Sequence, residues 1–257
     1  MPVISNRIET SLTKTKRPTS GKIIFISCEG QVTEEEYFEM ISNLFSGIKS
    51  KIQFISVMED ILSIPSRHRT AEQTRELTKS KPWQLVEKID KFKTNEENRY
   101  DFSNHPEDEF WIISDVDDNT NPINIQKWNQ MLEDCSTKQY GCAISNPFFE
   151  FWLLLHHVDA EDSDFNFAVT NNHPYEKTTH YTERLTNDAN APLRQKHISS
   201  NHYNIEKVKA AINRAKTLHN GETQPWPSNL GSTVYLLLEK VVEIADSITI
   251  KKDDNDI

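Results

Sequence analysis

The chain has 257 residues, 36% of them hydrophobic and 26% charged, which is typical of a globular protein with one large or two small domains. No apolar run reaches the roughly 18 residues of a membrane helix, and residues 1–20 lack the apolar core of a secretory signal. Three scattered cysteines favour a reducing compartment. We therefore expect a cytoplasmic protein without membrane contact. The formal net charge of −10 argues against coating a nucleic-acid backbone by bulk electrostatics, although a local basic groove or a metal-bridged phosphate remains compatible with it.

The first strand and helix carry two carboxylates of interest. The apolar run 22–27 predicts a strand, and the helix after it is expected to begin with a capping box made by Thr33 and Glu36. On the helical wheel Glu34 falls on the apolar stripe, whereas the neighbouring acids face away from it. We therefore expect Glu34 to point into the structure, beside Glu29 at the end of the strand.

The next elements are expected in regular alternation. The sequence predicts a strand at 51–57, a loop or short helix at 58–81, an amphipathic helix at 82–94, a polar loop at 95–108, a helix at 123–134, a strand at 140–144, a helix at 205–218 and a last helix at 231–244. The basic residues within 58–81 could contact phosphates, but charged surface is the simpler interpretation.

Carboxylates also follow a second apolar run, residues 110–113. A short apolar run that ends in a polar turn predicts a strand buried on both faces, as in a parallel sheet. Asp115 and Asp117 lie two residues apart, so both point to the same side if the chain is still extended there. Two carboxylates this close repel each other unless a proton or cation lies between them, and Mg²⁺ or Mn²⁺ prefers such oxygen ligands. A solvated acidic turn is the alternative interpretation.

A fifth carboxylate lies in an unusually apolar helix. Asn146 is expected to cap a helix whose residues 148–155 are apolar on every side apart from Glu150. Such a helix is buried all round, and a buried carboxylate must be paired, protonated or bound to a metal. A salt bridge to an arginine or a hydrogen bond to backbone would make Glu150 purely structural.

The alternation of strands and helices predicts an α/β fold, a mostly parallel sheet flanked by helices with a mainly helical C-terminal extension. The expected divisions are a disordered basic arm at 1–20, an α/β core at 21–158, a mainly helical part packed on the core at 159–246 and a polar tail at 247–257. If the strands at 22–27 and 110–113 are parallel neighbours, their carboxylates meet at one sheet edge. There they could hold one or two divalent cations, and two metals about 4 Å apart can clamp the reacting oxygens of a phosphodiester.

Three motifs together resemble the RloB-like family. They are the Cys-Glu-Gly-Gln-Val-Thr-Glu-Glu-Glu-Tyr-Phe run at 28–38, the Asp-Val-Asp-Asp cluster at 115–118 and the Ser-Asn-Pro-Phe-Phe-Glu-Phe-Trp-Leu-Leu-Leu-His run at 145–156. A strand with Glu-Gly followed by a strand with Asp-x-Asp is also the pattern of the Toprim fold. The C-terminal stretches 210–219 and 229–233 look like the signature of the family, where Leu230 departs from its usual proline. The resemblance covers roughly residues 22–245.

The resemblance implies a Toprim-type effector of bacterial or archaeal anti-phage defence and abortive infection, encoded beside an ABC- or AAA-type ATPase. The implied activity is metal-dependent hydrolysis of a phosphodiester in DNA or in RNA such as tRNA. Glu29 would be the Toprim glutamate, acting as metal ligand or general acid and base. Asp115 and Asp117 would hold Mg²⁺ or Mn²⁺, and Glu34 and Glu150 would support the same site as catalytic groups, with Glu34 also a ligand. Whether the chain forms a homodimer stays open.

Two alternatives belong to other classes. The chain could be a non-catalytic interaction subunit that binds a partner ATPase, with the acids holding a structural cation or none, and the net acidic charge favours this view. The Asp-x-Asp motif is also found in aspartate-nucleophile phosphatases. Those require Thr or Val four residues after the first aspartate, where this chain has Asn119, so this alternative ranks last.

Overall fold

A computed structural model describes the chain over residues 22–30, 32–45, 52–57, 61, 64–78, 81–116, 122–170, 174–220 and 226–253. The predicted basic arm at 1–20 and the candidate ligand Asp117 therefore lie outside the described residues.

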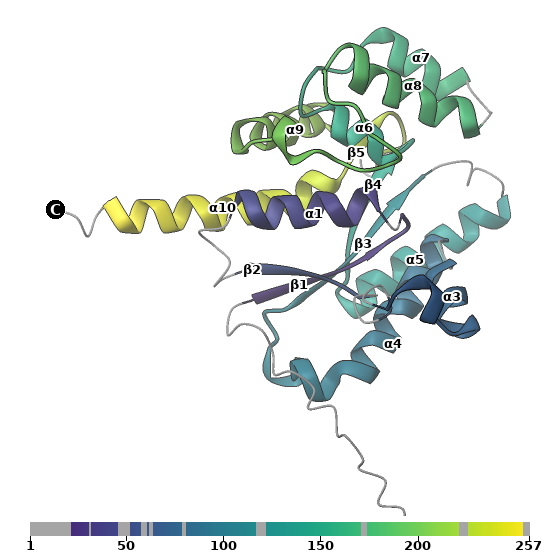
Figure 1. Cartoon of the computed structure of the whole chain (residues 1–257), viewed down its shortest axis with the longest axis vertical. Coiled ribbons are helices and arrows are strands. Elements are labelled where there is room, and N and C mark those ends of the chain that lie inside the picture. The colour runs from purple at the N-terminus through teal and green to yellow at the C-terminus, as the bar shows by residue number, and fades with distance from the viewer. Residues whose placement is uncertain are drawn as a thin grey trace, which may run out of the picture.

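The expected α/β fold is confirmed, and its centre is a five-stranded sheet (Figure 1). The strand order is β2-β1-β3-β4-β5, with β1 to β4 parallel and the short β5 antiparallel to β4. The strands are β1 (Lys22–Cys28), β2 (Ile52–Ser56), β3 (Glu109–Asp115), β4 (Gly141–Asn146) and β5 (Gly231–Ser232). Residues 23–26 of β1 and 110–113 of β3 are buried, because helices cover both faces of the sheet.

One face of the sheet is covered by α4 (Pro82–Tyr100) and α5 (Pro122–Lys138), with α3 (Ala71–Thr78) on the same side (Figure 1). Rings from α4 and from the 3₁₀ turn η3 (Phe102–Asn104) surround Phe25 of β1. The predicted loop at 95–108 is therefore wrong in its first part. The helix continues because Tyr100 is buried in this core, and it ends at Asp101, whose φ is 54°.

The other face is covered by α1 (Thr33–Leu44), α6 (Phe149–Leu154), α9 (Ile205–Leu218) and α10 (Val234–Asp253). All six residues of α6 are buried, which confirms a helix enclosed on every side. The C-terminal part also completes the sheet, since β5 pairs with the end of β4. The last helix continues to Asp253, well into the predicted polar tail. No helix within the described ranges is long and apolar enough to cross a membrane.

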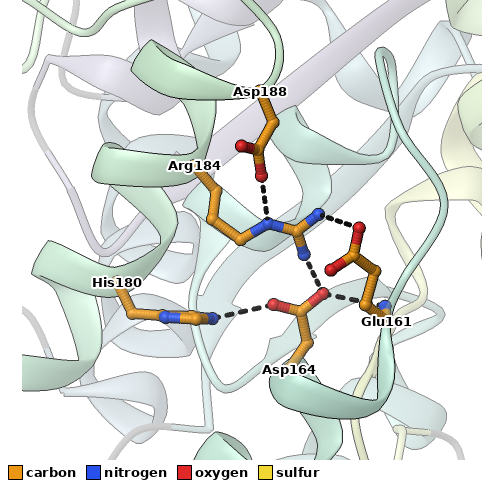
Figure 2. A network of polar contacts seen from close by, with 5 residues as sticks. All are labelled: Glu161, Asp164, His180, Arg184 and Asp188. Atoms are coloured by element: carbon orange, nitrogen blue, oxygen red, sulfur yellow. Dashed lines mark hydrogen bonds and ion pairs between the residues drawn. The ribbon is translucent and has the colours of Figure 1, made fainter.

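The remaining helices, α7 (Asp162–Thr170) and α8 (Pro174–Asn187), form a pair at the top of Figure 1, near α6. The described residues also include two further 3₁₀ turns, η2 (Ser66–His68) and η4 (Ser200–His202). A polar network around the buried Asp164 and Arg184 joins α7 and α8, as Figure 2 shows. Asp164 of α7 accepts hydrogen bonds from Arg184 and from the backbone N–H of Glu161, and lies 2.8 Å from Nε2 of His180. The arginine also contacts Glu161 and Asp188.

Two predicted helix caps are wrong. Thr33 donates its hydroxyl to the carbonyl of Lys196, and Glu36 accepts from the backbone of Ile198, so neither side chain caps α1. The side chain of Asn146 donates to the carbonyl of Pro227, and α6 begins only at Phe149. In each case a distant segment offers the cap-forming group a hydrogen bond, which competes with the local one.

Candidate functional site

The order of the strands brings Glu29 next to the carboxyl end of β3. Strands β1 and β3 are parallel neighbours with Cys28 opposite Ile113, so the residues that follow each strand meet at one edge. The hydroxyl of Ser114 donates to Oε2 of Glu29 at 2.6 Å, and the backbone N–H of Asp115 reaches the same oxygen at 3.3 Å. The carboxylate of Glu29 therefore lies beside the backbone of Asp115, which confirms that the two strand ends meet.

Glu34 reaches this edge from the first turn of α1. Its side chain is buried, with 8% of the residue exposed, as the helical periodicity predicted. The carboxylate lies against the backbone of Gly30, since a Cβ built on that glycine would be 2.0 Å from Oε2 of Glu34. Position 30 must therefore lack a side chain if Glu34 is to keep this place, which gives the Glu-Gly pair a packing reason.

The buried carboxylates influence one another electrostatically. Burial, followed by the charges of Glu150 and Glu29, raises the pKa of Glu34 to about 7, although a backbone hydrogen bond opposes the rise. Burial also raises the pKa of Glu150, which is 9% exposed on the enclosed helix α6. A cation near these groups would favour their ionised forms, so this part of the sheet edge is suited to bind one.

The donor set consists of hard carboxylate oxygens, which suits Mg²⁺ or Mn²⁺ better than softer metals. Over the ranges that the structure describes, however, no three or more His, Cys, Asp or Glu side chains come close enough together to hold a metal ion. Asp117, the fourth predicted ligand, lies outside those ranges. The described residues thus supply the ligand chemistry and the contact between Glu29 and Asp115, but not a complete coordination sphere.

A cavity of about 590 Å³ lies on the α3–α4 side of the sheet, where β2 ends. Its lining includes Val57, just after β2, and the lysines Lys88 and Lys91 of α4. The charge of Lys88 also acts on Glu35 and Cys28, so this lysine reaches towards the end of β1. The sequence analysis missed both lysines, because charged residues spaced by three on an amphipathic helix are indistinguishable from a solvated face.

The edge of the sheet where Glu29, Glu34 and Asp115 lie is called the acidic edge. In the described part of residues 58–81, the basic residues do not converge on it. Arg67 is exposed, and its Nε lies 3.3 Å from the neighbouring His68 ring. Arg69 donates to the carbonyls of Ile61 and Ile64 and so ties its own loop together. A third lysine that the sequence analysis missed is Lys196, whose charge acts on both Glu34 and Glu150. Only the tertiary fold reveals that Lys196 is near Glu34, because the two residues are about 160 positions apart in the sequence.

Comparison with protein-family models gives a match to the model described as RloB-like protein over residues 24–241. Comparison with curated proteins and with solved structures gives no match.

Proposed function

Because the chain belongs to the RloB-like family, we propose that it is a metal-dependent Toprim-type nuclease, the effector of a bacterial or archaeal anti-phage system that works with a partner ATPase. The observation that carries this proposal is the contact of Glu29 with the Ser114–Asp115 segment beside the buried Glu34. In open α/β sheets ligands bind outside the carboxyl ends of the strands, and these carboxylates lie at that edge.

In the proposed reaction each side chain has a separate task. Glu29, Asp115 and Asp117 would hold Mg²⁺ or Mn²⁺, which would supply Lewis-acid stabilisation of charge on the phosphodiester oxygens. Ser114 orients the carboxylate of Glu29 through its 2.6 Å hydrogen bond. Glu34, with its pKa raised to about 7 by burial and by the neighbouring carboxylates, is suited to take up or release a proton near neutral pH, and Glu150 keeps that pKa high.

The substrate in this proposal is DNA or an RNA such as tRNA. Lys88 and Lys91 line a cavity at the neighbouring strand end, where ammonium groups could contact a phosphate backbone. Glu72 and Glu96 line the same cavity, so a phosphate contact there depends on where the two ammonium groups lie and not on a net basic charge of the lining.

The first test is calorimetric titration of the metal-free chain with Mg²⁺ and Mn²⁺. We expect the parent to bind and the double variant Asp115→Ala with Asp117→Ala to lose binding. The matched control, Glu39→Ala with Glu133→Ala, removes two exposed carboxylates elsewhere and so changes the net charge equally. It should bind like the parent. Equal binding by all three proteins would contradict a metal site at this edge.

The second test is cleavage of plasmid DNA and bulk tRNA, with and without the ATPase encoded nearby. We expect Glu29→Gln to reduce cleavage by about 100-fold or more, while its unfolding midpoint stays close to that of the parent. Cleavage by Glu29→Gln at the parental rate would contradict the proposed mechanism.

The alternative is a non-catalytic subunit that binds the partner ATPase, and the net charge of −10 favours such a protein partner over nucleic acid. On this view a complex with the ATPase forms equally well with the Asp115→Ala, Asp117→Ala variant. Neither the parent nor this variant then cuts any substrate, alone or in the complex.

A further inference from the structure

A tight turn from the C-terminal part of the chain lies against the start of α1. Arg194 and His197 form an isolated antiparallel bridge, with mutual backbone hydrogen bonds of 3.2 and 3.0 Å. The two residues between them, Gln195 and Lys196, have φ values of 53° and 70°. Two-residue hairpin turns with positive φ at both central positions favour Asn and Gly, so Gln and Lys are unusual there.

The turn is attached to α1 by three hydrogen bonds. The hydroxyl of Thr33 donates to the carbonyl of Lys196 at 2.8 Å. Both carboxylate oxygens of Glu36 are engaged, one 2.6 Å from Nδ1 of His197 and the other accepting from the backbone N–H of Ile198 at 2.9 Å. On either side of the turn, Leu193 and Ile198 pack against the main core. Hydrogen bonds to α1 and apolar contacts with the core thus hold the turn in place.

This attachment places Lys196 beside the acidic edge. Its carbonyl is bonded to Thr33, the residue directly before the buried Glu34, and its charge acts on Glu34 and on Glu150. The residue is nonetheless exposed, and among the described residues no carboxylate forms an ion pair with its ammonium group. An unfavourable backbone conformation that the surroundings maintain is a reason to look for a function.

We propose that Lys196 is a further residue of the acidic site, held there by the turn so that its ammonium group contacts the phosphate backbone of bound nucleic acid. The proposal rests on the nuclease function proposed above. A polyanion that approaches Glu29, Glu34 and Asp115 is repelled unless cations line its path. Lysine is a common phosphate contact that acts as a point charge, and this one comes from a part of the chain remote from the strands.

The test separates the charge of Lys196 from the conformation of its turn. Lys196→Asn removes the charge while supplying a residue that tolerates positive φ, and Lys196→Gly does the same as a second neutral variant. Lys196→Arg keeps the charge. The matched control is Gln195→Asn, which places the same residue type at the neighbouring position of the turn without changing the charge. Thermal unfolding of each full-length variant checks that the turn still forms.

The measurement is the binding of a short fluorescein-labelled single-stranded DNA, and of an RNA of the same sequence, in Mg²⁺ over about 50–200 mM salt. We expect both neutral variants to bind about fivefold to tenfold more weakly, with the slope of log K against log salt reduced by about 1. Gln195→Asn and Lys196→Arg should keep the parental slope.

Two failures can be told apart. If the parent binds and the neutral variants bind with the same affinity and slope, the assignment of Lys196 is wrong while the nuclease proposal stands. If the parent neither binds nor cuts any nucleic acid, the proposed function fails and the role of Lys196 fails with it.

Discussion

Two buried carboxylates in this molecule have opposite surroundings. Asp164 is completely buried, and burial alone would raise its pKa, but hydrogen bonds from Arg184, the backbone N–H of Glu161 and His180, with the charge of Arg184, hold the pKa below its usual value (Figure 2). Glu34 is nearly as buried, and there burial and two neighbouring glutamates raise the pKa to about 7.

The difference separates an acid that is paired with an arginine of the fold from one whose ionised form is disfavoured by its surroundings. The cationic partner of Asp164 is part of the fold, so the charge of this acid is balanced without any ligand. The charges that act on Glu34 come from two glutamates and from the exposed Lys196, and burial together with the glutamates outweighs the lysine, so the ionised form is costly without a further cation. Perturbed carboxylates of the second kind gather at functional sites more often than those of the first.

The largest expected effect on stability comes from breaking the polar network around Asp164. Arg184→Met leaves Asp164 buried without its main cation and should lower the free energy of unfolding by about 3–5 kcal/mol, because an uncompensated buried charge is costly. Urea unfolding followed by circular dichroism measures this. Arg67→Met is the control, since Arg67 is exposed and its loss should change the stability by less than about 0.5 kcal/mol. Equal effects of the two variants would contradict the role of the network.

Amide substitutions of the two acids should change stability in opposite directions. At pH 8 and without metal, Asp164→Asn should destabilise the chain by about 2–4 kcal/mol, because it weakens the contacts with Arg184 and His180. Glu34→Gln should stabilise it by about 1–2 kcal/mol, because it removes a carboxylate whose ionised form is disfavoured. If Glu34→Gln destabilises at this pH, the comparison between the two acids is wrong.

The dependence on pH gives an independent check of Glu34. A carboxyl whose pKa is raised on folding keeps more protons in the folded state, so its contribution to stability is present at low pH and is lost as pH rises. We expect the stability of the metal-free parent, relative to Glu34→Gln, to fall by on the order of 2 kcal/mol between about pH 4.5 and pH 7. The contribution of Asp164, whose pKa is lowered, should be lost only as pH falls below about 3.8. A constant difference between parent and Glu34→Gln across this range would contradict the raised pKa.

The smallest expected change in stability comes from Gly30→Ala. The added methyl group would meet the carboxylate of Glu34 at 2.0 Å, so the flexible end of that side chain must move. We expect a cost of about 1 kcal/mol, which should largely disappear when Glu34→Ala is also present. We also expect Gly30→Ala to weaken the binding of Mg²⁺, by a free energy larger than the loss of stability. Unchanged metal affinity in Gly30→Ala would show that the position of Glu34 does not matter for the site.

Local pattern was enough to determine the main strands and the burial of two of the candidate carboxylates. Continuous apolar runs predicted β1 and β3, and an apolar stripe with period 3.6 predicted that Glu34 is buried, because these signals depend only on neighbours in the sequence. The enclosed helix around Glu150 followed from the same reasoning. The contact of Glu29 with Asp115 followed once the two strands were assumed to be parallel neighbours.

The tertiary structure alone decided which distant groups complete these elements. Thr33 and Asn146 were predicted to cap helices, but each donates a hydrogen bond to a carbonyl far along the chain, on Lys196 and Pro227 respectively. A polar side chain takes whichever partner the fold brings near it, and local spacing carries no record of a partner 163 residues away. The sequence therefore determined that Glu29 follows one strand, that Asp115 ends its parallel neighbour and that Glu34 is buried, whereas only the packed chain decided that Lys196 lies near Glu34.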